Sequence, residues 1–140
     1  MTSGEARARL AGARVAHLAS SAADGTPHVV PCTFALLGDA TIVSAVDHKP
    51  KRTTALRRLA NIATNPRVAL LADHYEDDWE ALWWARADGT ARVVAPGAES
   101  DLRAAAAAAL AARYPQYREQ PPAGALVVIA VDRWSGWSAA

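Results

Sequence analysis

Three cations stand together just before a stretch with the pattern of a helix. Lys49, Lys51 and Arg52 directly precede two threonines and a run whose leucines and alanines fall on one helical face. A helix N-terminus already carries partial positive charge, so fixed cations there raise the local free energy unless an anion binds among them. Backbone N–H groups, the hydroxyl of Thr53 or its neighbouring threonine, and the cationic side chains could converge on one phosphate.

An ordinary solvated basic face is the alternative, and this stretch alone leaves both interpretations open. It lacks the glycine spacing of a P-loop or a dinucleotide fold, so a nucleoside triphosphate is not indicated. The basic charge is local, because residues 48–67 hold six cations and no acid while residues 73–80 hold five acids and no cation. With a net charge of only +1, the chain does not have the basic excess expected of a general nucleic-acid binder.

Other catalytic and metal-binding patterns are missing from the sequence. There is no G-x-S-x-G elbow, and His17, His28, His48 and His74 lack the close pairing of a zinc site. Cys32 is the only cysteine, which excludes an internal disulfide and suits a reducing compartment. We therefore predict no catalytic acid, base or metal ligand, and expect a cofactor to carry the chemistry if the protein is an enzyme.

Length and composition indicate one soluble domain over residues 1–140. The first ten residues carry charges of both signs and have no apolar segment of signal-peptide length. The longest apolar run, Ala104 to Ala112, is too short to span a bilayer and has arginine at both ends. We expect a cytoplasmic protein without membrane contact.

Turn residues divide the first half of the chain into strands. Asp24-Gly25 separates two apolar segments and predicts a hairpin between Val15–Ser20 and Pro27–Leu37. Pro31 lies inside the second strand and cannot donate to a ladder, so we expect an edge, a bulge or an opening there. An opening could admit a ligand to the backbone of Val30, Pro31, Cys32 and Thr33.

Further elements follow from β-branched runs, helix stops and alanine content. The expected ones are a strand at Thr41–Val46, a helix at Thr53–Ala63, strands at Arg67–Ala72 and Glu80–Ala95, a helix at Glu99–Arg113 and a last strand at Ala125–Asp132. We interpret Glu80–Ala95 as one strand kinked at Gly89 by a bulge rather than as a hairpin. Gln116 to Gly124 is expected to be a polar connection. The sum is a mainly β fold of about six antiparallel strands, a small closed or partly open barrel with flanking helices.

The tryptophans are the other candidates for a site. Trp83 and Trp84 should point to opposite faces of their strand, one into the core and one toward a groove or a partner. Trp134 and Trp137 lie in the terminal RWSGW, where exposed indoles are costly unless they are covered by the barrel or by a second subunit.

Several blocks together give the chain a family likeness. HLASSAADGTPHVVPCTFAL, DHKPKRTTALRRLANIATNPRVALLADHYEDDW, LWWARADGTARVV, RYPQY and the terminal RWSGW resemble the pyridoxamine 5′-phosphate oxidase-like superfamily. More narrowly, they resemble its actinobacterial branch of coenzyme F420-dependent oxidoreductases. The resemblance covers nearly the whole chain and implies a six-stranded antiparallel split β-barrel of the FMN-binding type, with flanking helices, that forms a homodimer with two cofactor sites at the interface.

The resemblance also implies positions for the cofactor. Its phosphate would be held at Lys49, Lys51, Arg52 and Thr53, where the charge argument independently places an anion. The isoalloxazine-like ring would lie along the backbone of two segments, Val30–Pro31–Cys32–Thr33 and Ser44–Ala45–Val46. A tryptophan of the partner chain, Trp84, Trp134 or Trp137, would close the pocket.

The implied activity is hydride transfer between reduced F420 and a small unsaturated organic substrate, with the protein supplying binding, orientation and exclusion of competing reactions. Three alternatives stay open. An FMN-binding oxidase would use the same phosphate cluster, although cations such as Arg57 or Arg58 would favour the longer, acidic F420 tail. A protein that binds or stores a deazaflavin without turnover would need no acid–base residue. A haem-handling split barrel is disfavoured because no histidine stands in a marked ligand context.

Overall fold

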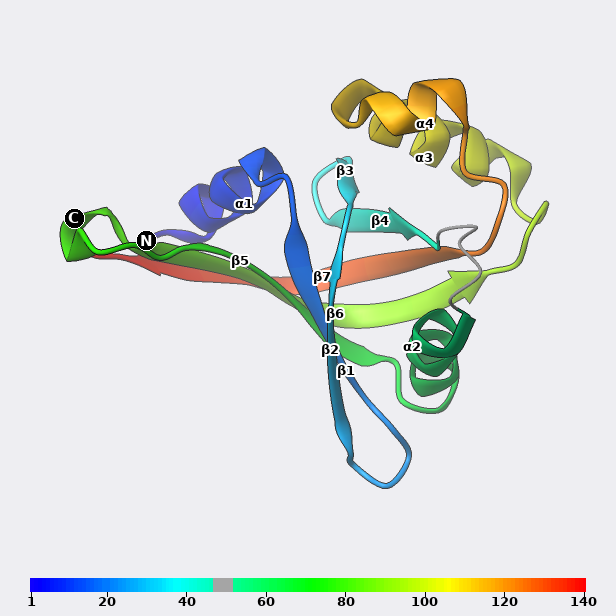
Figure 1. The fold of residues 1–140 in the computed structure, drawn as a ribbon, viewed down its shortest axis with the longest axis horizontal. Helices are drawn as coiled ribbons and strands as arrows, with labels where there is room; N and C mark the ends of the chain where they lie inside the picture. Colours follow the sequence, from blue (N-terminus) through cyan, green and yellow to red (C-terminus); the bar gives the residue numbers. More distant parts are fainter. Residues whose placement is uncertain (47–51) are drawn as a thin grey trace.

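The computed structural model describes residues 1–46 and 52–140, and within 52–56 only the course of the backbone (Figure 1). The elements in the described part are α1 (Ser3–Gly12), β1 (Ala16–Ser21), β2 (Pro27–Cys32), β3 (Ala35–Leu37), β4 (Thr41–Ala45), α2 (Arg52–Thr64), β5 (Arg67–His74), the 3₁₀ turn η1 (Trp79–Ala81), β6 (Trp83–Val94), α3 (Ser100–Arg113), α4 (Pro115–Glu119) and β7 (Leu126–Ser138). None of these helices is long and apolar enough to cross a membrane.

Within those residues all strands belong to one antiparallel sheet of seven strands, in the order β2-β1-β5-β6-β7-β4-β3. The two edge strands, β2 and β3, follow each other directly in the chain and do not pair, so the barrel is split between them. The predicted mainly β architecture with flanking helices is confirmed. The expected number of six strands is wrong, because the strand predicted at Pro27–Leu37 divides at Thr33-Phe34, which we call the crossing.

Thr33 and Phe34 can leave the strand ladder because side chains supply hydrogen-bond partners for their backbone groups. The Ser44 hydroxyl donates to the Thr33 carbonyl at 2.7 Å, and the Tyr114 hydroxyl accepts from the Phe34 N–H at 3.2 Å. A buried backbone group needs a partner, and these two bonds replace partners that a neighbouring strand would have supplied. Because Tyr114 lies eighty positions further along the chain, no local pattern announced the break.

Local turn chemistry explains the elements that were predicted well. The β1–β2 hairpin closes with the Gly25 N–H donating to the Ala22 carbonyl at 2.9 Å, and Gly25 has the positive φ of 87° that such a turn favours. Pro31 does lie on an edge strand, as its missing N–H requires. Helix α2 ends at Thr64, directly before Asn65-Pro66.

Strands β6 and β7 form a long ribbon that extends beyond the barrel toward the chain ends (Figure 1). Their register shifts between Asp88 and Gly89, as predicted, but the extra residue is Asp132 on β7. Gly89 is required here because a Cβ would run into the Ala130 carbonyl oxygen. The prediction that the last strand ends at Asp132 is wrong, since β7 continues past the bulge to Ser138 and pairs with the start of β6.

The core lies on both faces of the sheet. Inside the barrel, α1 and α2 cover an apolar cluster that includes Leu18, Ile42 and Leu70. On the outside, α3 covers a second cluster around Leu110 and Leu126. Figure 1 shows α3 and α4 above β3 and β4, α2 at the opposite side, and α1 on the extended ribbon. Helix α4 occupies part of the segment that we expected to be a polar connection.

The tryptophans of the ribbon divide between its two faces. Trp83 and Trp134 pack on the inner cluster under α1, where the Arg9 guanidinium lies 5.1 Å from the Trp83 ring centroid. Trp84 and Trp137 pair across β6 and β7 on the opposite face. The predicted alternation of Trp83 and Trp84 is therefore confirmed.

Candidate functional site

Three polar side chains gather inside the barrel, near the ends of β2 and β4 and beside α2. Cys32 ends β2, the Ser44 side chain is buried on β4, and Arg58 reaches in from α2. Burial raises the pKa of the Cys32 thiol, while the neighbouring Ser44 hydroxyl and the charge of Arg58 act in the opposite direction. The three groups are thus close enough to influence one another in a largely apolar interior. We call them the mouth cluster, and we call the end of the barrel where they lie the mouth.

Arg58 is the unusual member of the mouth cluster. Arg58 is only 8% exposed, and its Nε atom is buried without a hydrogen-bond partner. Across residues 1–46 and 57–140, no carboxylate forms an ion pair with it. A buried charge without a counter-ion costs several kcal/mol in principle, and proteins normally compensate it with an anion. Within residues 1–46 and 57–140, the mouth cluster therefore includes no negative charge to balance Arg58.

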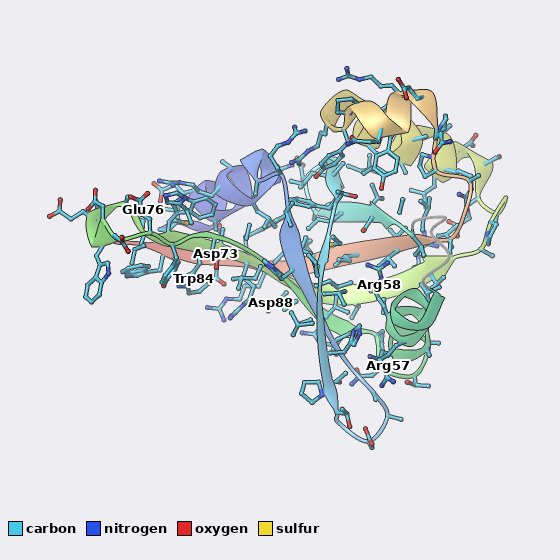
Figure 2. The ribbon with its side chains drawn as sticks, in the orientation of Figure 1. Arg57, Arg58, Asp73, Glu76, Trp84 and Asp88 are labelled. Atoms are coloured by element: carbon cyan, nitrogen blue, oxygen red, sulfur yellow. The ribbon has the colours of Figure 1, made fainter. Side chains whose placement is uncertain are left out.

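Sequence reasoning placed Arg58 with Arg57 as a cation lining an exit for the cofactor tail. Arg57 is exposed on α2, whereas Arg58 lies on the helix side that faces the strands (Figure 2). The signal that could have separated them is the spacing of Arg58, Asn61 and Asn65, which puts three polar residues on one face of the helix.

The two asparagines fix α2 against the first hairpin. The Asn61 amide donates to the Ser20 hydroxyl at 3.2 Å, and the Asn65 amide donates to the Ser21 hydroxyl at 2.8 Å. Close by, His28 pairs with Ser20 in the ladder and has a buried Nδ1 without a partner. These bonds hold the helix in one rotation and therefore hold Arg58 toward Cys32.

The backbone at the mouth includes an N–H donor, that of Thr33, which could serve a ligand. Among the described residues, the Thr33 N–H has no protein acceptor, while its carbonyl accepts from Ser44 and its hydroxyl lies 3.0 Å from the Tyr117 hydroxyl. The Val46 N–H is already used by the Ala125 carbonyl at 3.0 Å. Thr33 can therefore donate to a ligand at the point where the edge strand ends.

The other strand residues predicted to lie along the cofactor ring are divided between the two faces of the sheet. Val30 and Val46 pack against the inner cluster near the mouth. Pro31 is exposed on the outer face, and the Ala45 side chain is buried toward α3, so these two could meet an internal ligand only through backbone atoms. The structure thus brings Cys32, Thr33 and Ser44 together and turns two other side chains away.

The predicted phosphate-binding residues are only partly within the described chain. Lys49 and Lys51 lie outside it, and for Arg52 and Thr53 only the backbone, in the first turn of α2, is described. Their assignment stays a prediction. The junction itself has the expected order, with β4 ending at Ala45 and α2 beginning at Arg52.

Trp84 and Trp137 lie on the ribbon, away from the mouth cluster of their own chain. Figure 2 shows Trp84 and Arg58 on opposite sides of the β1–β2 hairpin. The Trp84 ring packs under the Arg86 guanidinium at 5.4 Å, and Trp137 is 43% exposed. The prediction that one of these indoles closes the pocket from a partner chain stays a prediction.

One face of the sheet lacks a helical cover among the described elements. Its residues point outward from β2, β1, β5 and the ribbon. Leu71 pairs with both His17 and Arg86 in the ladders, and His17 pairs with Pro31. Val29, on the same face, is 62% exposed. We call this surface the open sheet face; it also includes Trp84 and Trp137.

Comparisons with known proteins agree with this architecture. The family model described as pyridoxamine 5′-phosphate oxidase matches residues 2–138. A search among curated proteins finds no match. Among solved structures, a conserved hypothetical protein of Mycobacterium tuberculosis has a TM-score of 0.73 and 22% identity, covering 99% of this chain and 86% of that one.

Two further solved structures have similar folds and printed ligands. A FAD-binding protein of Mesorhizobium loti has a TM-score of 0.71 at 22% identity, with 97% of this chain and 94% of that chain covered. A heme storage protein of Vibrio cholerae has a TM-score of 0.71 at 18% identity, with 96% and 92% covered. At these identities the likeness supports the fold alone.

Proposed function

The chain belongs to the pyridoxamine 5′-phosphate oxidase family, and on this basis we propose that it binds coenzyme F420 at the mouth cluster and acts as an F420-dependent oxidoreductase. The observation that carries the proposal is Arg58, a buried guanidinium for which the described residues offer no acid. A phosphate-bearing cofactor supplies the missing negative charge.

The phosphate would lie between α2 and the end of β4. Arg58 provides a buried charge on one side, and Lys49, Lys51, Arg52 and Thr53 are the predicted donors on the other. A guanidinium held by the packing of its helix loses little side-chain entropy on binding, so its contribution to affinity is larger than that of a surface cation.

The ring would lie along the ends of the edge strand and of β4. The Thr33 N–H can donate to a ring carbonyl or nitrogen, and the Cys32 thiol, held neutral by its raised pKa, presents a polarisable surface. When bound, F420 supplies hydride transfer to an unsaturated organic substrate. The chain's own contribution is to bind the phosphate, orient the ring and exclude water from the inner cluster.

The distribution of cations favours F420 over FMN. Arg57 is exposed on the turn of α2 next to Arg58, where an acidic tail that extends beyond the phosphate would pass. FMN ends at its phosphate and would leave Arg57 without a role. The FAD-binding relative keeps a flavin as the alternative within the same proposal.

A homodimer through the open sheet face completes the pocket in this proposal. Val29, Pro31, His17 and Leu71 form a continuous exposed or half-buried strip, and an apolar strip of this kind is more stable when covered. Pairing with a second copy would cover it and would bring the ribbon of one chain, with Trp84 or Trp137, toward the mouth of the other. Two sites per dimer follow from the symmetry.

A haem-binding or storage role is the competing function, because a heme storage protein has the same fold. The described residues contain no group of three or more His, Cys, Asp and Glu side chains arranged to hold a metal ion. His28, on the inner face, has a buried and unpartnered Nδ1 that could meet such a ligand.

Equilibrium titration of the purified protein with F420, FMN and haemin, each alone, tests the proposal. We expect tight binding of F420, weaker binding of FMN and no saturable binding of haemin. Arg58→Met, which keeps the approximate volume of the side chain without its charge, should weaken F420 binding about a hundredfold or more. Arg118→Met on α4 is the matched control. Tight haemin binding with no F420 binding would overturn the proposal. If F420 binds but no hydride is transferred to any unsaturated acceptor, the proposed function is limited to binding or storage of the cofactor.

A further inference from the structure

The RYPQY block, residues 113–117, lies far from the mouth cluster in the sequence but converges on the crossing. Three of its side chains contact Thr33 or Phe34. Tyr114 hydrogen-bonds the Phe34 backbone, Tyr117 reaches the Thr33 hydroxyl, and the Arg113 guanidinium lies 4.8 Å from the Phe34 ring centroid. The function proposed above uses Thr33 and leaves this block without a role.

Tyr114 is the centre of the arrangement. Tyr114 is 6% exposed, and its hydroxyl accepts from the Phe34 N–H at 3.2 Å. The carbonyls of Arg14 and Phe34 lie 2.9 and 3.1 Å from the same oxygen, and its single proton serves one or the other. One buried hydroxyl thus joins the crossing to the segment that leads into β1.

Arg113 and Tyr117 are the two neighbours of Tyr114 in this arrangement. The Arg113 guanidinium donates to the Ala11 carbonyl at 2.7 Å and also to the Ala13 carbonyl, which ties the end of α1 to the end of α3. The rings of Tyr114 and Tyr117 meet edge to face, with centroids 5.9 Å apart. Since Phe34 is fully buried beneath Arg113, the crossing has little room to shift.

We propose that the RYPQY block is a positioning device for the ligand, and that Tyr114 is its positioning residue. The Tyr114 hydroxyl accepts from the Phe34 N–H and gives its one proton to the carbonyl of Phe34 or of Arg14. Through these bonds Tyr114 keeps the Phe34 backbone away from a strand partner. The Thr33 N–H, for which the described residues provide no acceptor, is then available to donate to the ring of the cofactor. Tyr117 sets the Thr33 side chain in the same way. This inference rests on the proposed function, because it assigns Thr33 the role of ring donor.

A positioning role differs measurably from a purely structural one. If Tyr114 only stabilises the fold, Tyr114→Phe lowers the melting temperature, but the folded protein binds its cofactor as before. If Tyr114 positions the crossing, the folded variant also binds more weakly, since the Thr33 N–H must be ordered at the expense of binding free energy.

The experiment compares Tyr114→Phe and Tyr117→Phe with Tyr75→Phe, the same change at a residue that is 63% exposed in the loop after β5. Amide hydrogen exchange at Thr33 and Phe34 is measured first, without cofactor. Titration with F420 and with FMN follows below the melting temperature of each variant. For Tyr114→Phe we expect faster exchange at Phe34 and about tenfold weaker cofactor binding, the scale of one lost buried hydrogen bond. Tyr75→Phe should match the parent in every readout.

The hydroxyl pair of Thr33 and Tyr117 provides a second, independent measurement. Thr33→Val and Tyr117→Phe, alone and together, form a double-mutant cycle on cofactor affinity. We expect the double variant to bind about as well as the weaker single variant, because both changes remove one interaction. Additive losses would overturn the role of Tyr117, and unchanged affinity in folded Tyr114→Phe would overturn the role of Tyr114.

Failure of the proposed function has a different signature. If the parent protein binds neither F420 nor FMN, the proposed function is wrong, and the positioning role fails with it, although the exchange data still report whether Tyr114 orders the crossing. If the parent binds and Tyr114→Phe binds equally well, only the positioning role fails.

Discussion

The Ser44 hydroxyl donates to the Thr33 carbonyl at 2.7 Å and so joins β4 to the crossing between the two edge strands. Ser44 is buried, with an exposed fraction of 3%, and its side chain also neighbours the Cys32 thiol. One hydroxyl therefore connects the split of the barrel to the mouth cluster. This position makes Ser44 a sensitive probe of both.

Replacing Ser44 by alanine should destabilise the protein by about 1–3 kcal/mol, because the Thr33 carbonyl loses its partner in a region that water does not readily reach. Urea denaturation of the parent and the variant measures the difference. Ser138→Ala near the C-terminus, whose hydroxyl contacts only the exposed Ala140 carbonyl, is the control and should change stability little. A Ser44→Ala variant as stable as the parent would show that the crossing does not depend on this bond.

The Cys32 thiol gives stability a specific alkaline dependence. Burial raises its pKa above the ordinary value of 9.0, so in the folded state it keeps its proton at a pH where the unfolded chain has lost it. The resulting stabilisation is complete below the unfolded pKa and is lost as the pH rises from about 9 through the folded pKa. Denaturation from pH 7 to 10.5 should show this decline in the parent and a smaller decline in Cys32→Ala. Equal slopes in the two proteins would contradict it.

Much of the fold follows from local chemistry that the sequence displays. The Asp24-Gly25 turn and the stop at Asn65-Pro66 each depend on residues within a few positions, and both occur where predicted. A register shift also occurs at Gly89 as predicted, but its extra residue is Asp132 on β7. The family likeness, carried by the same blocks, predicted the split barrel.

Other features depend on partners far along the chain. The break at Thr33-Phe34 needs Tyr114, and the extension of β7 beyond Asp132 needs the start of β6 as its ladder partner. Residue type does not separate the buried Arg58 from the exposed Arg57. The rotation of α2 against β1, which the Asn61 and Asn65 bonds fix, distinguishes them. Tertiary contacts decided each of these points.

Arg58→Met should have opposite effects on stability and on binding. Without cofactor, the variant should be as stable as the parent or more stable by about 1 kcal/mol or more, because a buried charge is replaced by an apolar chain of similar volume. Cofactor affinity should fall about a hundredfold or more, since the phosphate loses a charge-assisted partner. Thermal denaturation with and without F420 measures both. A variant that is strongly destabilised without cofactor would indicate that the chain itself supplies a counter-ion to Arg58.

Replacing Lys49 and Lys51 together by alanine tests the phosphate assignment that precedes α2. Binding of F420 should weaken by about 2–4 kcal/mol if each side chain makes a charge-assisted bond, while folding stays nearly intact. Fluorescence titration measures the first effect and circular dichroism the second. Arg7 and Arg9 on α1 provide a control pair of cations distant from the mouth, although their contacts with Trp134 and Trp83 require that stability be measured in parallel. Undiminished binding in the lysine variant would place the phosphate elsewhere.

Leu71→Asp tests whether the open sheet face joins two copies. Leu71 lies in the middle of this face, between His17 and Arg86 in the ladder, and a carboxylate there would have to be desolvated in any pairing of the two faces. We expect the parent to sediment as a dimer and Leu71→Asp as a folded monomer with weakened F420 binding, because the partner's ribbon no longer covers the mouth. Asp101→Asn, an exposed change on α3, should leave the dimer intact. A Leu71→Asp protein that remains dimeric would assign the interface to another surface, and one that is monomeric but binds F420 normally would show that each mouth is complete within its own chain.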